Sequence, residues 1–243
     1  MKWRKVSSGQ FYDANESTVV YYDSHSGDTH LLSDFAAWIV QQFSEDSLTI
    51  EQLREQFKHR LAQGEIALRV GPYIYNLQSN LSTVAEGLAT LYPDFHLADP
   101  QEYIDYNVAI MSKGPLRRLF GQSEFLFDST SPFESIPTAQ AYAFLEWGMN
   151  WCVSLHTNEY LKLHAAAVSR GENTVIMPGV PGAGKSTLCA ALGLRGWRIL
   201  SDEHAMIPPN STEVVPLCRP VSLKNESIDV IKAFSADAVF GPV

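Results

Sequence analysis

The sequence predicts an α/β protein in which a mixed-sheet domain follows a small α+β module. Apolar residues recur at helical spacing after two short β-branched segments in the first 63 residues, and strict alternation replaces that spacing from residue 64. Strand and helix patterns then follow in turn from residue 161. The 243 residues, 45% of them hydrophobic, are enough for one or two domains with a buried core. We expect a module over residues 1–62 and a larger domain over residues 64–243.

The N-terminal module is expected to contain a hairpin and two helices. Residues 17–23 and 29–32 have the β-branched and aromatic composition of strands, and turn-forming residues separate them. Ser33 can cap a helix whose apolar side chains return every three or four positions. Thr49 and Gln52 have the spacing of a capping box, which predicts the start of a second helix. This order of elements predicts a winged-helix-like module.

The larger domain is expected to begin with two strands that turn at Gly71 and Pro72, because the apolar residues on either side alternate. The elements predicted after this pair are a helix over 81–92, strands over 103–111 and 125–127, an apolar helix buried between layers over 139–154, strands over 161–168 and 174–177, a helix over 186–194 and a strand over 197–200. The strand, loop, helix and strand at the end imply a layer with a parallel component.

Charge and composition exclude several classes of function. The chain carries 18 Lys and Arg against 27 Asp and Glu, a net charge of -9, which repels nucleic acid. No apolar run approaches the roughly 18 residues that cross a bilayer, and the N-terminal segment lacks the apolar stretch of a secretory signal. We therefore expect a cytoplasmic protein with neither nucleic acid nor a membrane as partner. Three cysteines, Cys152, Cys189 and Cys218, are expected to be reduced thiols.

Residues 179–186 read Gly-Val-Pro-Gly-Ala-Gly-Lys-Ser and match in full the phosphate-binding loop pattern G-x-x-x-x-G-K-[ST]. A predicted strand precedes the loop and a predicted helix follows it, so that loop amides and the helix N-terminus face one anion. We expect Lys185 to contact the outer phosphates of ATP and Ser186 to bind Mg2+. The residues expected to bind the nucleotide are Gly179, Val180, Pro181, Gly182, Ala183, Gly184, Lys185, Ser186 and Thr187.

Two acidic residues end the next predicted strand, seventeen and eighteen positions after Lys185. Phosphoryl transfer to a hydroxyl requires a carboxylate on the far side of the metal and a base that takes the hydroxyl proton. We expect Asp202 to be the metal ligand and Glu203 to be the base.

A histidine lies on the strand predicted before the loop. If this strand pairs antiparallel with the strand that enters the loop, His164 borders the phosphate site. A single histidine among apolar residues is more commonly a core residue, so its spacing alone leaves both interpretations open. The chain contains neither the N-K-x-D motif of GTPases nor the L-S-G-G-Q segment of transporter ATPases, which favours a kinase.

Taken together, His164, the loop at 179–186 and the segment Arg-Gly-Trp-Arg-Ile-Leu-Ser-Asp-Glu at 195–203 resemble the HPr kinase/phosphorylase family, as does the phrase Arg-Pro-Val-Ser-Leu-Lys-Asn at 219–225. The resemblance extends over roughly residues 64–243. It implies a P-loop kinase core with a mixed sheet, which phosphorylates a serine of a small carrier protein and assembles into a homo-oligomer.

The family also assigns roles to individual residues. By this resemblance His164 and Lys185 are active-site groups, Ser186 binds magnesium and Glu203 is the proton acceptor. The sequence differs from the family in having Glu203 where an aspartate is usual, and it lacks the L-E-h-R-G segment. It also ends where relatives continue with a further strand and a helix that carries an active-site arginine, so we expect a truncated chain or a reduced member.

Residues 19–32 and the two helices predicted after them resemble PqqD-type peptide chaperones. That resemblance implies a module that binds a peptide as an added strand at a sheet edge. The alternative is a structural cap on the larger domain.

From these observations we expect an ATP- and Mg2+-dependent kinase that phosphorylates a serine or threonine of a peptide or small protein. A kinase for a small metabolite is one alternative. A nucleotide-gated peptide-binding or assembly protein without phosphotransfer is another. The absence of the glutamate of the L-E-h-R-G segment and of the arginine on the further helix of the relatives favours this second alternative.

Overall fold

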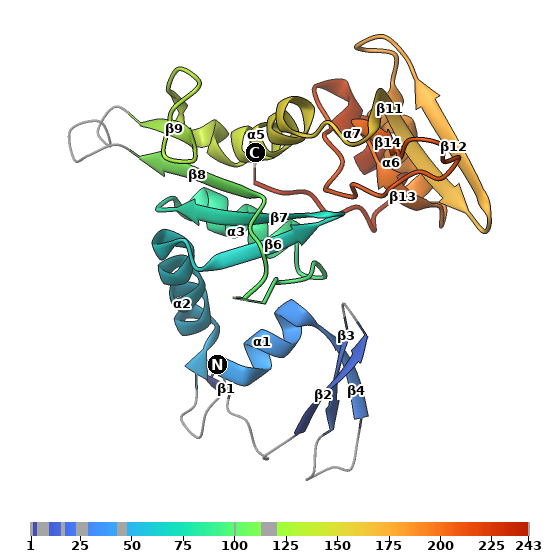
Figure 1. Ribbon diagram of the computed structural model, residues 1–243. Helices are drawn as coiled ribbons and strands as arrows, with labels where there is room; N and C mark the ends of the chain where they lie inside the picture. Colours follow the sequence, from blue (N-terminus) through green and yellow to red (C-terminus); the bar gives the residue numbers. More distant parts are fainter. Residues whose placement is uncertain are drawn as a thin grey trace. The chain divides into compact units, whose positions relative to one another are not determined.

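The computed structural model is a mixed α/β protein, as the sequence predicts (Figure 1). The structure describes residues 2–3, 10–15, 18–22, 29–42, 48–99, 101–112 and 121–242. The chain divides into two compact units. The first unit comprises residues 1–69, 73–145 and 241–243, and the second comprises residues 70–72 and 146–240.

The N-terminal hairpin is confirmed and belongs to a three-stranded antiparallel sheet. Its strands, in the order of the sheet, are β2 (Gln10–Asn15), β3 (Thr18–Tyr22) and β4 (Thr29–Ser33). Helix α1 (Asp34–Gln42) follows, and the Ser33 hydroxyl accepts from the Ala36 amide at 3.3 Å, as expected of a cap. The turn expected at 25–28 and the apolar residue Phe43 lie outside the described residues.

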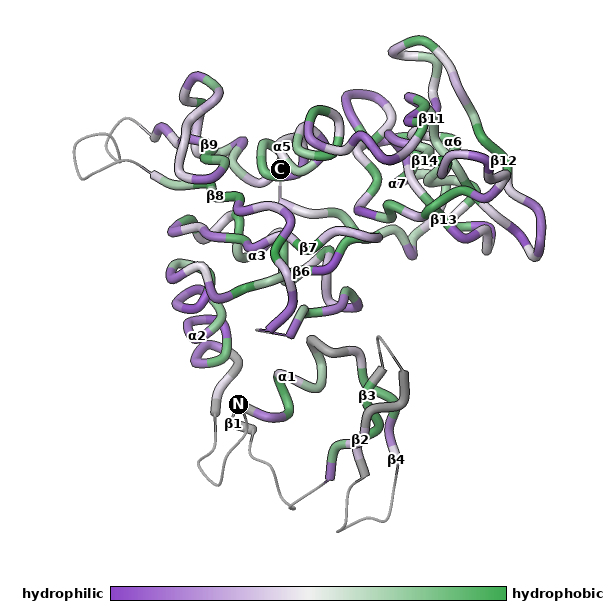
Figure 2. The backbone as a smooth tube through the Cα atoms, in the orientation of Figure 1, coloured by the Kyte–Doolittle hydropathy of each residue, from purple (hydrophilic) through white to green (hydrophobic). Residues whose placement is uncertain are grey.

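Helix α2 (Ile50–Gln63) begins with the expected capping box. The Gln52 amide donates to the Thr49 hydroxyl at 3.2 Å, and the Thr49 amide donates to the Gln52 side chain at 2.8 Å. Strand β1 (Lys2–Trp3) pairs with β5 (Leu48–Thr49) just before it. Figure 2 shows hydrophilic and hydrophobic residues alternating along α2, whose apolar side chains Phe57 and Leu61 are buried.

A five-stranded mixed sheet forms the centre of the first unit. Its strands are β6 (Ile66–Val70), β7 (Tyr73–Ser79), β8 (Tyr106–Ser112), β9 (Gln122–Phe127) and β10 (Ile136–Pro137), in the order β10-β9-β8-β7-β6. Strands β7 and β8 are parallel, and α3 (Ser82–Leu91) lies between them in the sequence. Because α2 packs against β7, the compact units do not divide near residue 63, and the domain boundary drawn there stays a prediction.

The second unit is built around one long strand. Its elements are the end of α5 (Ala141–His156), then β11 (Leu161–Arg170), β12 (Asn173–Pro178), α6 (Lys185–Gly193), β13 (Arg198–Ser201), β14 (His204–Ile207) and α7 (Glu226–Phe234). Strand β11 pairs antiparallel with β12 on one side and with β13 and β14 on the other. Strands β12 and β13 therefore run in the same direction, but β11 separates them. The parallel component expected in this region is therefore not a hydrogen-bonded pair, because β12, β13 and β14 each pair antiparallel with β11, and the parallel pair among the described strands is β7 and β8.

Alternate side chains of β11 pack into two separate clusters. Ala165 and Ala167 contact Leu200 and Ala205, whereas Ala166 and Val168 pack with Cys189 of α6. Helix α6 thus covers the face of β11 that carries the even-numbered residues. The burial between layers expected of the helix over 139–154 is wrong at several positions, since Ala143, Trp147 and Ser154 are exposed.

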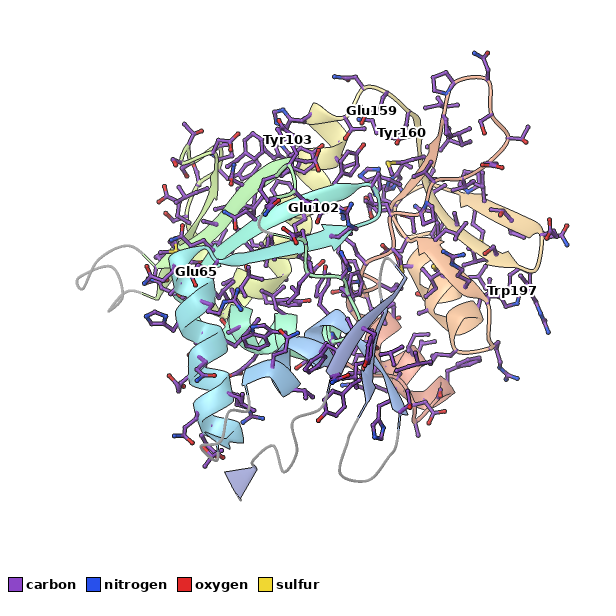
Figure 3. All side chains as sticks on the ribbon, turned by 60° about the horizontal axis from the view of Figure 1, so that its bottom comes forward. Glu65, Glu102, Tyr103, Glu159, Tyr160 and Trp197 are labelled. Atoms are coloured by element: carbon purple, nitrogen blue, oxygen red, sulfur yellow. The ribbon has the colours of Figure 1, made fainter. Side chains whose placement is uncertain are left out.

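Different residues lie near the two ends of β11, and Figure 3 labels Trp197 near one end and Glu159 and Tyr160 near the other. Arg170 stacks on Trp197 at 5.9 Å at the end where β11 turns into β12. Glu159 and Tyr160 precede the other end.

Within the part of the chain that the structure describes, no helix is both long and apolar enough to span a membrane.

Candidate functional site

The predicted phosphate loop connects the edge strand β12 to the start of α6, as the sequence predicts. Gly182 and Gly184 have φ values of 83° and 82°, a region that a residue with a Cβ atom adopts at a cost. All six residues from Gly179 to Gly184 are exposed, and Lys185, Ser186 and Thr187 form the partly buried first turn of α6. The main chain of the loop is therefore accessible to a ligand at the N-terminus of a nine-residue helix.

Lys185 folds back over the loop that precedes it. Its ammonium group donates to the carbonyl oxygens of Gly179 at 2.8 Å and Val180 at 3.3 Å. A Cβ atom at Gly179 would lie 3.3 Å from the Ala183 side chain and 3.6 Å from the Lys185 side chain, so the loop is tight where it begins. These contacts hold a positive charge against the loop, where an outer phosphate is expected.

Asp202 follows the last residue of β13 and is buried, with 4% of its surface exposed. The Ser222 amide donates to its Oδ2 atom at 2.8 Å. Burial raises the pKa of the Asp202 carboxyl, while the Ser222 hydrogen bond and the charge of Arg219 oppose that shift. A buried carboxylate with one fixed hydrogen bond is suited to hold a cation, because a cation offsets the cost of burying its charge.

Cys189 connects helix α6 to the residues around Asp202. Cys189 comes three residues after Ser186 on α6, so the two side chains are neighbours on the helix surface. The Cys189 thiol donates to the Ser201 carbonyl at 3.7 Å, and the Asp202 charge contributes to its raised pKa. Among the described residues no group of three or more His, Cys, Asp or Glu forms a metal cluster. Mg2+ takes one or two protein ligands and completes its coordination with phosphates and water, so two oxygen ligands such as Ser186 and Asp202 would be enough for it.

His164 and Glu203 form a pair beside the loop. The His164 Nδ1 atom lies 3.2 Å from the Glu203 Oε1 atom, and the two side chains are 49% and 34% exposed. The Ala165 amide donates to the Glu203 carbonyl at 3.2 Å, which fixes the acid next to β11. Ala165 also faces Pro178, the last residue of β12, across the β11–β12 pair, so His164 comes one residue before the point where this pairing begins. That His164 borders a phosphate site stays a prediction.

Two polar residues near the acid pair, Arg219 and His204, have no role predicted from the sequence. Arg219 is 6% exposed and forms an ion pair with Glu146 at 3.1 Å. His204 faces His164 across the β11–β14 pair, and its Nε2 atom lies 2.9 Å from the Ser154 hydroxyl. Burial lowers the pKa of His204. Arg219 begins the segment 219–225 quoted above from the sequence. Its partner Glu146 is 73 residues away, and no local pattern indicates the pair.

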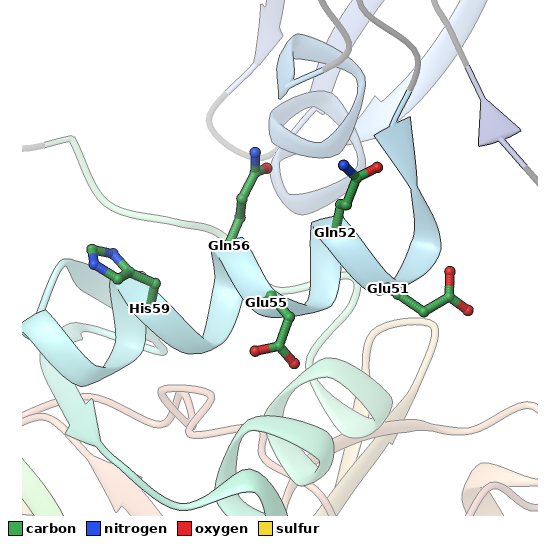
Figure 4. Close-up of a pocket in the computed structure, with 5 residues that line it drawn as sticks. All are labelled: Glu51, Gln52, Glu55, Gln56 and His59. Atoms are coloured by element: carbon green, nitrogen blue, oxygen red, sulfur yellow. The ribbon is translucent and has the colours of Figure 1, made fainter.

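A hollow lies along the exposed side of α2. Its lining residues are Glu51, Gln52, Glu55, Gln56 and His59. These side chains project from successive turns of one helix and do not converge on a single point (Figure 4). The hollow offers no loop of amides and no strained backbone, so the phosphate loop remains the better candidate.

The candidate site thus consists of the loop, Lys185, Ser186, the acid pair at 202–203 and His164, gathered where β11, β12 and β13 meet α6. Comparison of the chain with protein-family models, with curated proteins and with solved structures found no match.

Proposed function

We propose that this protein is an ATP- and Mg2+-dependent phosphotransferase of the HPr kinase type that phosphorylates a serine or threonine hydroxyl of a peptide or small carrier protein. One observation carries the proposal: the glycine loop with Lys185 folded over it and the His164–Glu203 pair lie at the same point of β11. A phosphate-binding element and a partly exposed carboxylate in one place are the two parts that phosphoryl transfer to a hydroxyl requires.

The loop and the first turn of α6 supply the nucleotide site. The loop amides and the N-terminus of α6 would bind the phosphates, and Lys185 would exchange its carbonyl partners for phosphate oxygens. Ser186 and Asp202 would hold Mg2+, which, when bound, neutralises charge on the phosphates.

Glu203 is suited to the proton transfer, because it is partly exposed whereas Asp202 is buried. The substrate hydroxyl oxygen would form a bond to the γ-phosphorus, and the bond from that phosphorus to the oxygen bridging to ADP would break. The hydroxyl proton would pass to the Glu203 carboxylate, which His164 holds at 3.2 Å. The products are a phosphoserine or phosphothreonine and ADP.

Two features favour a peptide or protein substrate. The exposed fractions of His164 and Glu203, 49% and 34%, leave the pair accessible to a hydroxyl that another chain carries. In the three-stranded sheet of the first unit, β2 and β4 are edge strands among the described residues, and an extended peptide can add to such an edge.

The test compares Glu203→Gln with Glu213→Gln, a matched substitution at an exposed loop position of the same unit. Calorimetry measures binding of ATP with Mg2+, and radiolabelled ATP measures transfer to an array of peptides with serine, threonine or alanine at one position. We expect all three proteins to bind ATP within about twofold of one another, and Glu203→Gln to lose transfer by about 100-fold or more.

The outcomes separate the alternatives. Absence of ATP binding by the unsubstituted protein would overturn the proposal. Binding without transfer to any peptide would favour the nucleotide-gated binding protein instead. Equal transfer by Glu203→Gln and the unsubstituted protein would remove Glu203 from its proposed role.

A further inference from the structure

The segment 217–222 runs past Asp202 and is held at three points. The Leu217 amide donates to the Leu200 carbonyl at 2.9 Å, which ties the segment to β13. The Arg219 Nη1 atom donates to the Glu146 carbonyl at 2.7 Å and to its carboxylate at 3.1 Å. The Ser222 amide reaches Asp202 at 2.8 Å. The contact to Asp202 is thus made by a stretch of chain whose own position depends on Arg219.

Stability alone does not explain the Arg219–Glu146 pair, because burying two charges costs free energy. The two side chains are 4% and 15% exposed, so both charges have lost most of their hydration. Apolar residues of similar volume commonly stabilise a fold as well as a buried ion pair or better. The pair fixes the orientation of the Arg219 side chain, because the guanidinium group donates to the main-chain oxygen and to the carboxylate of the same residue, Glu146.

We propose that Arg219 is a positioning residue for the metal site: by anchoring the segment 217–222 to Glu146, it keeps the Ser222 amide on Oδ2 of Asp202 and so fixes the rotation of that carboxylate. This inference rests on the proposed function, since it assigns Asp202 to Mg2+. Loss of the anchor leaves the loop and Lys185 intact. It should therefore weaken the response to Mg2+ without weakening the binding of ATP alone.

The main test variant is the double substitution Arg219→Met with Glu146→Leu. Removing both partners avoids a buried charge without its counterpart, which would unfold the single variant more readily. Arg219→Lys keeps the charge but replaces the planar guanidinium group by an ammonium group, and it is the conservative variant. Arg170→Met, at the far end of β11, is the matched control for the loss of an arginine.

Two measurements are made on each full-length variant. Calorimetry gives the dissociation constant of ATP in EDTA and its change as Mg2+ is added. Electron paramagnetic resonance gives the affinity for Mn2+ in the presence of a non-hydrolysable ATP analogue, which needs no catalytic turnover.

We expect the double variant to need about tenfold more Mg2+ or Mn2+ for half-saturation, while its dissociation constant for ATP in EDTA stays within about twofold. Arg219→Lys should lie between it and the unsubstituted protein, and Arg170→Met should match the latter. A folded double variant with unchanged metal dependence would overturn the inference. If the unsubstituted protein binds ATP with no response to either metal, the proposed metal site itself fails, and the proposed function with it.

Discussion

The Nδ1 atom of His164 lies 3.2 Å from the Oε1 atom of Glu203, and this contact joins a strand to the irregular stretch between two other strands. Glu203 sits between β13 and β14, both of which pair with β11. The regular pairing of His164 with His204 therefore brings the preceding glutamate alongside the imidazole. The carboxylate is oriented by the sheet as well as by its own partner.

Replacing His164 by Gln should lower the rate of phosphoryl transfer about 10- to 100-fold, because Glu203 loses the group that orients it. The affinity for ATP should change less than twofold, since the loop contacts of Lys185 stay in place. Single-turnover transfer and calorimetry measure the two quantities. His156→Gln, at the end of α5, is the control, and a large loss of ATP affinity in His164→Gln would contradict the assigned role.

Substitutions at Gly184 should weaken ATP binding most strongly with valine, less with alanine and least with asparagine. The φ value of 82° costs a residue with a Cβ atom about 1–2 kcal/mol, and asparagine tolerates this region better than alanine or valine. A Cβ atom there would meet no atom within 4 Å, so the cost is conformational and not steric. Calorimetric affinities for ATP across the series check the order, and equal affinities would show that the loop reshapes on binding.

Asp202→Asn should stabilise the protein in the absence of metal while abolishing the effect of Mg2+ on ATP binding. Burial raises the pKa of the Asp202 carboxyl, so its ionised form costs stability at neutral pH and its protonation on acidification relieves that cost. The amide side chain carries no charge and still accepts from Ser222. A gain of about 1 kcal/mol corresponds to about 2–4 °C in melting temperature.

Scanning calorimetry at neutral pH measures this change, with Asp229→Asn on the exposed side of α7 as the control. A lower melting temperature for Asp202→Asn would mean that attraction to Arg219 outweighs the cost of burial.

Ionisation of the Cys189 thiol in the unfolded chain should lower the stability of the protein at alkaline pH. Burial raises the pKa of its thiol from 9.0 to about 12. The unfolded chain releases this proton near pH 9 and the folded chain does not, so the free energy of unfolding falls as the pH rises from 9 towards 12. The contribution of one group is about 1.4 kcal/mol per pH unit in that window.

Urea denaturation at pH 8 and pH 10 compares the unsubstituted protein with Cys189→Ala. The unsubstituted protein should lose about 1.4 kcal/mol more between the two pH values, because the variant has no thiol to ionise at this position. Equal losses in both proteins would show that the folded state releases the proton as readily as the unfolded chain.

Features that depend on neighbouring residues were the ones that could be predicted from the sequence. The capping box of Thr49 and Gln52 and the strand, loop and helix around Lys185 follow from local spacing. Pairing between distant segments could not be predicted. The insertion of β11 between β12 and β13 is one example, and the Arg219–Glu146 pair, separated by 73 residues, is another. Packing and burial decide such contacts, and a linear pattern carries little information about them.

Strand β11 has a consequence for how this chain can vary in length. Its residues 161–164 pair with β14 and residues 165–170 pair with β12, so one register aligns the acid pair and the loop together. An insertion or deletion inside the strand would displace His164 relative to both. Extra residues in the turn at 171–172 would leave both alignments unchanged. Natural variants of this chain should accordingly differ in size at that turn while keeping the ten residues before it constant in number.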